Sequence, residues 1–364
     1  MKPARLLNPR FVPSQWDLPG GHRFTLAVPP YGTATIRGNC FPRLDRRYGV
    51  DSASVRGLNR FNPDEDGASI PVEGTPLLVL PGLRGSDMGL ARVLSRLQGR
   101  EIWVLNPPGM GIASVEPNTE YSLDYLARFA SAVAEHMGAH PILVGHSFGA
   151  TWAAAAIQHS PTDFAGLVLI SPVVHAPARQ RDFLNRVSTR LVDLYCWALR
   201  HYLLPHWWVD RYSRGWLSNL VMANFGWPGW IRIRRGSLER QFLHADFRAV
   251  AAAQHAATHH DVTEFLTDQS SGAPTPLPPT AVIAGTADPL SPLPQLQELY
   301  RDLKNRPRPR PGLPPPLATF ITLRGAGHLM HHENYPSVSA ALDLAVKKFD
   351  DLQKQSAGGT HESA

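Results

Sequence analysis

The segment Gly-His-Ser-Phe-Gly at residues 145–149 contains the side chain whose chemistry is easiest to interpret. A serine with glycine two residues before and two residues after it is typical of a nucleophile elbow, in which a strand turns sharply into a helix. Gly145 and Gly149 leave room where side chains would collide as the strand and the helix close. Because Ile-Leu-Val precedes this segment and an apolar run follows it, we predict that Ser147 is a catalytic nucleophile.

A serine hydroxyl needs a base to remove its proton and a carboxylate to orient that base. Asp288 follows the apolar run Ala-Val-Ile-Ala, and His328 follows Phe-Ile-Thr-Leu. Catalytic groups gather at the carboxyl ends of strands in open α/β sheets. We therefore predict that His328 is the base and Asp288 the acid of a triad. The structural alternatives are that Asp288 only begins a turn before Pro289 and that His328 only caps a strand end.

The elements that must position these residues are short apolar runs separated by amphipathic helices. The runs predict buried strands at residues 77–80, 102–105, 142–144, 167–170, 281–284 and 320–323. Apolar residues at helical spacing predict helices around residues 90–97, 126–133, 296–303 and 342–349. This alternation predicts an α/β fold, with a mostly parallel central sheet flanked by helices.

The alternation stops between the strand near residue 170 and the strand near residue 281, where six tryptophans occur between Trp197 and Trp230. We interpret residues 175–261 as an inserted helical cap and residues 74–174 and 262–352 as the core. Residues 1–73 form an N-terminal extension with candidate edge strands at 24–28 and 33–36. Residues 353–364 are expected to form a flexible polar tail.

Taken together, these motifs resemble the α/β-hydrolase fold family over roughly residues 70 to 350. The order Ser147, Asp288, His328 matches that family, and the segment from His328 to Pro336 is similar to the run that opens its last helix. The resemblance implies an oxyanion hole formed by the backbone amides of Phe148 and Leu83. One departure is Pro81, which stands where the family usually has histidine.

The amino-acid composition and the net charge indicate which kinds of binding partner to expect. Hydrophobic residues make up 43% of the 364 residues and charged residues 18%, which is typical of a folded protein. The net charge of +6 comes from scattered basic residues that form no nucleic-acid-binding module, so no nucleic acid is expected. No apolar segment has the length of a membrane span, and the N-terminus lacks the apolar run of a signal peptide. These features favour a cytoplasmic protein.

No metal and no cofactor are expected. Cys40 and Cys196 are far apart and lack metal-ligand spacing. The segment from His259 to Asp261 offers too few ligands for a metal ion. His146 is interpreted as a packed neighbour of the serine, and His331 and His332 as polar residues at a helix start.

These residues predict a serine hydrolase that cleaves an ester, a thioester or a related acyl bond of a small molecule. Aromatic walls in the cap favour a substrate with an apolar acyl or aromatic portion. The same triad is compatible with amide or carbon–carbon bond hydrolysis, or with acyl transfer. The alternative outside the enzymes is a catalytically silent hydrolase fold that serves as a binding or scaffold protein. Arginines among the cap tryptophans leave peripheral contact with an anionic membrane as a further alternative.

Overall fold

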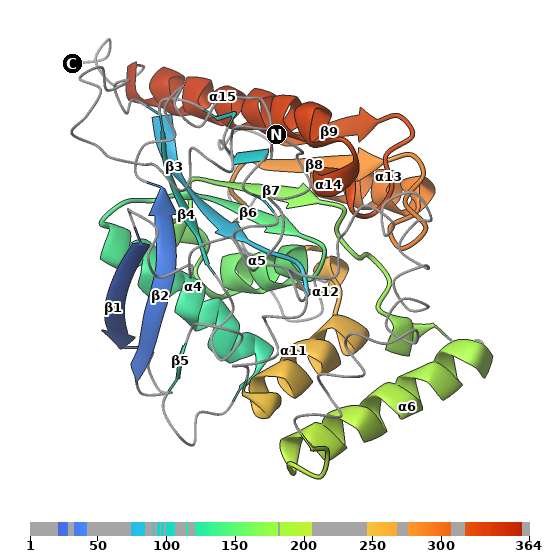
Figure 1. The fold of residues 1–364 in the computed structure, drawn as a ribbon. Coiled ribbons are helices and arrows are strands. Elements are labelled where there is room, and N and C mark those ends of the chain that lie inside the picture. The colour runs from blue at the N-terminus through green and yellow to red at the C-terminus, as the bar shows by residue number, and fades with distance from the viewer. Residues whose placement is uncertain are drawn as a thin grey trace, which may run out of the picture.

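A mostly parallel sheet runs through the computed structural model, with its strands in the order β1-β2-β4-β3-β6-β7-β8-β9 and β5 paired with β2 (Figure 1). The structure describes residues 21–27, 33–41, 74–83, 90, 93–94, 96–97, 100–105, 114–115, 121–180, 183–205, 246–267, 276–306 and 317–358. Within these ranges the strands are β1 (Gly21–Ala27), β2 (Thr33–Phe41), β3 (Gly74–Leu80), β4 (Arg100–Val104), β5 (Ser114–Val115), β6 (Ile142–His146), β7 (Gly166–Ile170), β8 (Thr280–Gly285) and β9 (Ala318–Leu323).

The six strands from β4 to β9 along this order are all parallel to their neighbours. Each overlaps one of the apolar runs in the sequence, so the predicted fold class is confirmed. Strands β1 and β2 pair antiparallel with each other, and β2 pairs antiparallel with β4. The two candidate N-terminal strands therefore lie at one edge of the sheet, with β1 outermost.

The helices lie on both faces of the sheet (Figure 1). They are α4 (Leu123–Met137), α5 (Phe148–His159), α6 (Phe183–Arg200), α11 (Phe247–His259), α12 (Val262–Leu266), α13 (Leu293–Asn305), α14 (Met330–Glu333) and α15 (Tyr335–Gly358). One apolar cluster joins α4, α5, α12 and α13 to the sheet. A second cluster joins α15 and the buried side chains of Leu90, Val93, Leu94 and Leu97 to the opposite face.

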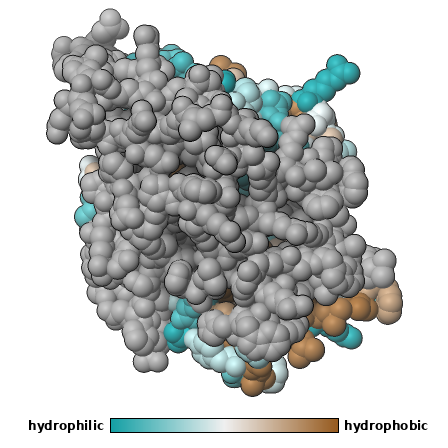
Figure 2. All heavy atoms as spheres, in the orientation of Figure 1, coloured by the Kyte–Doolittle hydropathy of each residue, from teal (hydrophilic) through white to brown (hydrophobic). Residues whose placement is uncertain are grey.

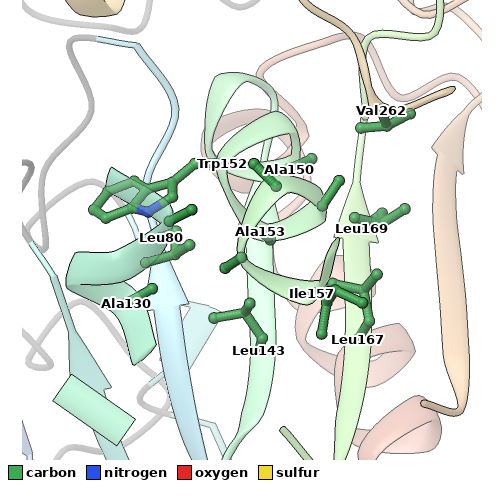
Figure 3. Packing of buried hydrophobic residues seen from close by; sticks show 14 of the residues in the cluster. Leu80, Ala130, Leu143, Ala150, Trp152, Ala153, Ile157, Leu167, Leu169 and Val262 are labelled. Carbon is green, nitrogen blue, oxygen red and sulfur yellow. The ribbon is translucent and has the colours of Figure 1, made fainter. Parts of the chain in front are cut away.

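Helix α5, which follows Ser147, is buried on nearly all sides. Figure 3 shows Ala150, Ala153 and Ile157 of this helix against Leu143 and Leu167 of the neighbouring strands. A helix that is apolar all round is stable only inside a protein core. Packing of α4 and α12 against α5 therefore fixes the helix that carries the serine at its N-terminus.

Helices α6 and α11 lie between β7 and β8 in the sequence, within the predicted cap. They pack together through a small apolar cluster that includes Cys196, Leu199 and Phe247. The opposite side of α6 exposes Phe183, Val187, Leu191, Leu194 and Trp197, and apolar residues gather there in Figure 2. Trp197 is 52% exposed, so it does not belong to a buried cap core, and the other tryptophans of the predicted cap cluster lie outside the described residues. The cap boundaries and membrane contact stay predictions.

No helix within the described ranges combines the length and the apolar character that crossing a membrane requires.

A buried ion pair ties the last helix to the sheet. Nη2 of Arg100 on β4 lies 2.8 Å from Oδ2 of Asp350 on α15. Its Nη1 donates to the carbonyl oxygen of Thr75 on β3 at 3.0 Å. The backbone N–H and the hydroxyl of Thr75 in turn donate to Asp350 Oδ1. Because the Arg100 side chain is only 4% exposed, its charge depends on Asp350, the one carboxylate that pairs with it among the described residues.

We expect Asp350→Asn to lower the free energy of unfolding by about 3 kcal/mol, because it leaves a buried guanidinium without its counterion. Asp343 on the same helix forms an exposed pair with Lys347, and Asp343→Asn should cost less than about 0.5 kcal/mol. Urea denaturation of both variants measures the difference. Equal costs for the two substitutions would show that the buried pair has no special role.

Candidate active site

Ser147 stands at the sharp turn between β6 and α5. Its backbone has φ 53° and ψ −118°, a conformation that side chains rarely adopt and that costs about 1–3 kcal/mol. Its N–H donates to the carbonyl oxygen of Ile170 at 3.0 Å, and its carbonyl accepts from Ala150 N–H at 2.9 Å. These bonds to β7 and to the first turn of α5 hold the strained residue in place.

The two glycines of the elbow are required by close backbone contacts. A Cβ atom on Gly149 would lie 2.1 Å from the carbonyl oxygen of Leu80, and one on Gly145 would lie 2.3 Å from the carbonyl oxygen of Gly149. Backbone atoms in a sheet and a buried helix cannot move aside as a flexible side chain would. The spacing of these glycines around Ser147 thus has the steric cause that the sequence suggested.

The structure brings Ser147, His328 and Asp288 into one hydrogen-bonded chain. Nε2 of His328 lies 2.8 Å from Oγ of Ser147, and Nδ1 lies 2.9 Å from Oδ2 of Asp288. His328 is 1% exposed and Asp288 is 5% exposed. Residues separated by 181 and 40 positions in the sequence therefore meet at the carboxyl edge of the sheet, in the order predicted for nucleophile, base and acid.

Asp288 also begins a turn, which is the structural role that the sequence analysis gave as the alternative to catalysis. Its Oδ1 accepts hydrogen bonds from the N–H groups of Leu290 at 2.9 Å and Ser291 at 3.0 Å. Burial by itself would raise the pKa of Asp288. The hydrogen bond from His328, the charge of His328 and the hydrogen bond from the Ser291 N–H act in the opposite direction and are together stronger, so the pKa lies below its usual value. The carboxylate is therefore charged at neutral pH and is fixed by its own turn while it orients His328.

His146 has a second role that the sequence did not reveal. Its Nε2–H donates to the backbone carbonyl oxygen of His328 at 3.1 Å, which fixes Nε2 as the protonated ring nitrogen. Its ring also packs against that of His331, with centroids 4.3 Å apart. His331 lies at the start of α14, the position that the sequence predicted for it, and its side chain is buried, with 7% exposed. The middle residue of Gly-His-Ser thus braces the loop that carries His328.

Ser171 is a site residue that the sequence analysis missed. It follows β7, is fully buried and has φ 46°. Its carbonyl accepts from the Ser291 hydroxyl at 3.2 Å, and its side chain helps to lower the pKa of Asp288. Its position after the apolar run Leu-Val-Leu-Ile, at the same sheet edge as the other site residues, is the signal that could have identified it.

Of the two predicted oxyanion donors, Phe148 directly follows the serine in the chain, whereas Leu83 belongs to the distant loop after β3. Phe148 is the first residue of α5, where backbone N–H groups have no partner within the helix. Gly82, directly before Leu83, packs on the elbow, since a Cβ on it would lie 3.3 Å from Cβ of Ser147 and 2.9 Å from Nδ1 of His146. The loop after β3 therefore reaches the elbow, and the oxyanion hole itself stays a prediction.

The sheet order, the turn at Ser147 and the hydrogen-bonded group of Ser147, His328 and Asp288 agree with a comparison of the sequence with known protein families. The model of the alpha/beta hydrolase fold family matches residues 75–335, and the chain belongs to that family. The match begins at β3 and ends at the first residue of α15, so it includes every residue of the candidate active site. The chain is therefore an α/β-hydrolase.

Known proteins show the same fold with different activities. A thermophilic esterase from Thermogutta terrifontis superposes with a TM-score of 0.62 at 17% identity, covering 90% of this chain and 99% of the esterase. A bromoperoxidase from Bacillus anthracis gives 0.59 at 14% identity, covering 90% of this chain and 100% of its own. At these sequence identities the similarity shows a common fold and not a common activity.

One curated relative matches in sequence. N-formylmaleamate deformylase from Pseudomonas putida is 31% identical over 110 residues, which is 30% of this chain. The match spans 41% of the deformylase. It is too short to transfer that enzyme's activity to this chain.

The buried histidines behind the site predict how stability depends on pH. Burial lowers the pKa of His146 to about 3 and lowers the pKa of His331 well below its usual value. Both are neutral in the folded chain and take up protons in the unfolded chain below about pH 6.5. The free energy of unfolding should therefore fall by about 1 kcal/mol for each of them between pH 7.5 and 5.5.

Urea denaturation at both pH values, in the wild type and in His146→Gln and His331→Gln, measures this loss. Each variant should lose less stability on acidification than the wild type, whatever its stability at pH 7.5. A variant with the same pH dependence as the wild type would show that the replaced histidine is not held neutral.

Proposed function

We propose that this α/β-hydrolase is a serine hydrolase that cleaves an ester, a thioester or a related acyl bond through Ser147, His328 and Asp288. The observation that carries the proposal is the continuous chain of hydrogen bonds from Asp288 through His328 to Ser147 Oγ. An imidazole that bonds a buried carboxylate at Nδ1 and a serine hydroxyl at Nε2 is arranged to accept the serine proton. The strained turn directs that hydroxyl away from the sheet.

In the proposed reaction, Ser147 Oγ attacks the acyl carbon while its proton moves to Nε2 of His328. Asp288 keeps the Nδ1 proton facing its carboxylate, so that Nε2 is free to accept. The imidazolium then protonates the leaving group. Water, deprotonated at the same Nε2, attacks the acyl-serine in the second half of the reaction, which releases the acid and restores Ser147.

The negative oxygen of each tetrahedral intermediate requires donors that are already in place. We propose the amides of Phe148 and Leu83 for this role, supported by the position of Phe148 at the start of α5 and by the contact of the Gly82 loop with Ser147. The N-terminus of α5 adds a favourable dipole. No cofactor is needed for these steps.

The substrate is proposed to be a small molecule with an apolar acyl or aromatic portion. The support is the insertion between β7 and β8, whose tryptophan-rich sequence from Trp197 to Trp230, apart from the exposed Trp197, is suited to apolar walls around a reacting group. We propose that residues 175–261, which include α6 and α11, form a cap on the core. The cap would then determine which acyl group reaches Ser147.

Amide hydrolysis is the second candidate function. It is favoured by the 31% identity over 110 residues to N-formylmaleamate deformylase, a name that denotes removal of a formyl group from nitrogen. The same triad supports this reaction, because His328 protonates a leaving nitrogen as readily as a leaving oxygen. What differs between the two candidates is the leaving group and not the nucleophile.

We expect substitutions of single side chains of the proposed triad to reduce activity to different degrees. Ser147→Ala should abolish p-nitrophenyl butyrate hydrolysis, and Asp288→Asn should lower kcat by about 10⁴-fold, because the asparagine amide favours the wrong tautomer of the imidazole. His159 at the exposed end of α5 provides a control, and His159→Gln should keep wild-type kcat. A folded Ser147→Ala variant with wild-type activity would contradict the proposal.

Substrate panels separate the candidate functions. With p-nitrophenyl esters from acetate to octanoate, kcat/KM should rise with chain length, because each buried CH₂ adds apolar contact. Flat or falling values would argue against an apolar acyl pocket. Parallel assays with thioesters, formamides and diketones compare the bond types, and a preference for formamides by kcat/KM would favour the second candidate.

A further inference from the structure

Three side chains with metal-ligand chemistry meet between α6 and α11. They are Asp193 on α6 and His255 and His259 on α11, and one ligand atom from each lies within 4.8 Å of the other two. Nε2 of His259 lies 2.7 Å and Nε2 of His255 lies 3.9 Å from Oδ1 of Asp193. None of the three belongs to the proposed triad, and neither helix contributes a triad residue.

Their arrangement has the geometry of a metal site. Histidines four positions apart lie on one face of a helix, and the rings of His255 and His259 stack with centroids 4.1 Å apart. The facing helix α6 supplies the carboxylate from the opposite side. Two imidazoles and one carboxylate are a donor set that binds Zn²⁺ with three protein ligands and leaves a fourth position for water. Small rotations of the side chains would bring the three atoms to equal distance from an ion.

The charges in the cluster are compatible with a bound cation. Arg200, on the same helix as Asp193, places a positive charge near the cluster. The carboxylate of Asp193 offsets the nearby guanidinium. His255 and Asp193 are each 41% exposed and His259 is 27% exposed, so an ion can enter from solvent.

The neighbouring histidine and aspartate have other partners. Nδ1 of His260 pairs with Glu264 Oε2 at 2.9 Å. Asp261 accepts from the N–H of Thr263 at the start of α12 and from the N–H of Ala176. The sequence drew attention to the run from His259 to Asp261, but the fold separates it and instead joins His259 to two residues that sequence proximity did not suggest.

We propose that Asp193, His255 and His259 bind one Zn²⁺ ion that joins α6 to α11. The segment between β7 and β8 enters through α6 and returns through α11, so an ion held by both helices fixes the entry and exit of that segment relative to each other. The small apolar cluster around Cys196 and the coordinated ion would then both hold α6 against α11. The site differs from the proposed active site in its residues, its helices and its chemistry.

Zinc titration of the full-length, tag-free, chelator-treated protein tests this proposal. Isothermal titration calorimetry with ZnCl₂ should show one site per chain that is lost or weakened about tenfold or more in His255→Gln and in His259→Gln, since even residues outside the coordination sphere change metal affinity roughly 10–100-fold. Zinc should also raise the thermal midpoint of the wild type. That rise should be absent in both variants.

The matched control is His201→Gln, because His201 directly follows α6 and contacts the ring of Trp197. It removes one exposed histidine near the cluster but no proposed ligand, so wild-type zinc affinity is expected. Asp193→Asn should weaken binding while preserving the helical circular dichroism spectrum. Replacement of zinc by Co²⁺ should give the visible absorption of a four-coordinate site in the wild type and in His201→Gln only.

Two results would overturn the proposal. One is the absence of zinc binding by the wild type at micromolar concentration. The other is binding of equal affinity in the wild type, His255→Gln and His259→Gln, which would assign the ion to other residues. Because the three ligands are partly exposed, the variants are expected to fold, and circular dichroism confirms that before titration. Hydrolase activity is not needed to read either outcome.

Discussion

The strained backbone of Ser147 is the constraint on which the rest of the site depends. A residue with φ 53° stays in that conformation only if the surrounding structure determines it fully. Here the backbone bonds from Ser147 to Ile170 and Ala150, the absence of side chains on Gly145 and Gly149, and the burial of α5 combine to do so. Relaxation of this turn would swing Oγ away from Nε2 of His328, and the base would lose its partner.

His328, the proposed base, depends on a second set of contacts. The ring of His328 is oriented by Asp288, while its backbone is held by the bond from His146. Asp288 in turn is fixed by the N–H groups of Leu290 and Ser291. The proposed nucleophile, base and acid therefore come from three separate strand ends, and the sheet register sets the distances among them. The geometry of the site therefore depends on the parallel part of the sheet.

The sequence predicted the parts of this protein that follow from local rules. Apolar runs predicted the six parallel strands, and the elbow pattern predicted the turn at Ser147, because both depend on neighbouring residues. Asp288 and His328 were predicted because each follows a buried strand. Their meeting in space followed from the topology of a parallel sheet.

Contacts between distant segments were beyond sequence reasoning. The bond from His146 to the carbonyl of His328, the burial of His331 and the place of Ser171 beside Asp288 depend on how loops pack, which no periodic pattern encodes. Likewise, Asp193 lies 66 residues from His259, and only the packing of α6 on α11 brings the two together. The exposure of Trp197 was likewise beyond sequence reasoning, since an apolar residue type does not determine which face of a helix is covered.

Covalent labelling tests the central claim most directly. The purified protein should react with a fluorophosphonate probe, and peptide mapping by mass spectrometry should place the adduct on Ser147. Second-order labelling should be lost in Ser147→Ala and slowed strongly in a folded His328→Gln variant, because the hydroxyl is activated only through the imidazole. Labelling of the wild type no faster than Ser147→Ala, or an adduct on another residue, would contradict the account.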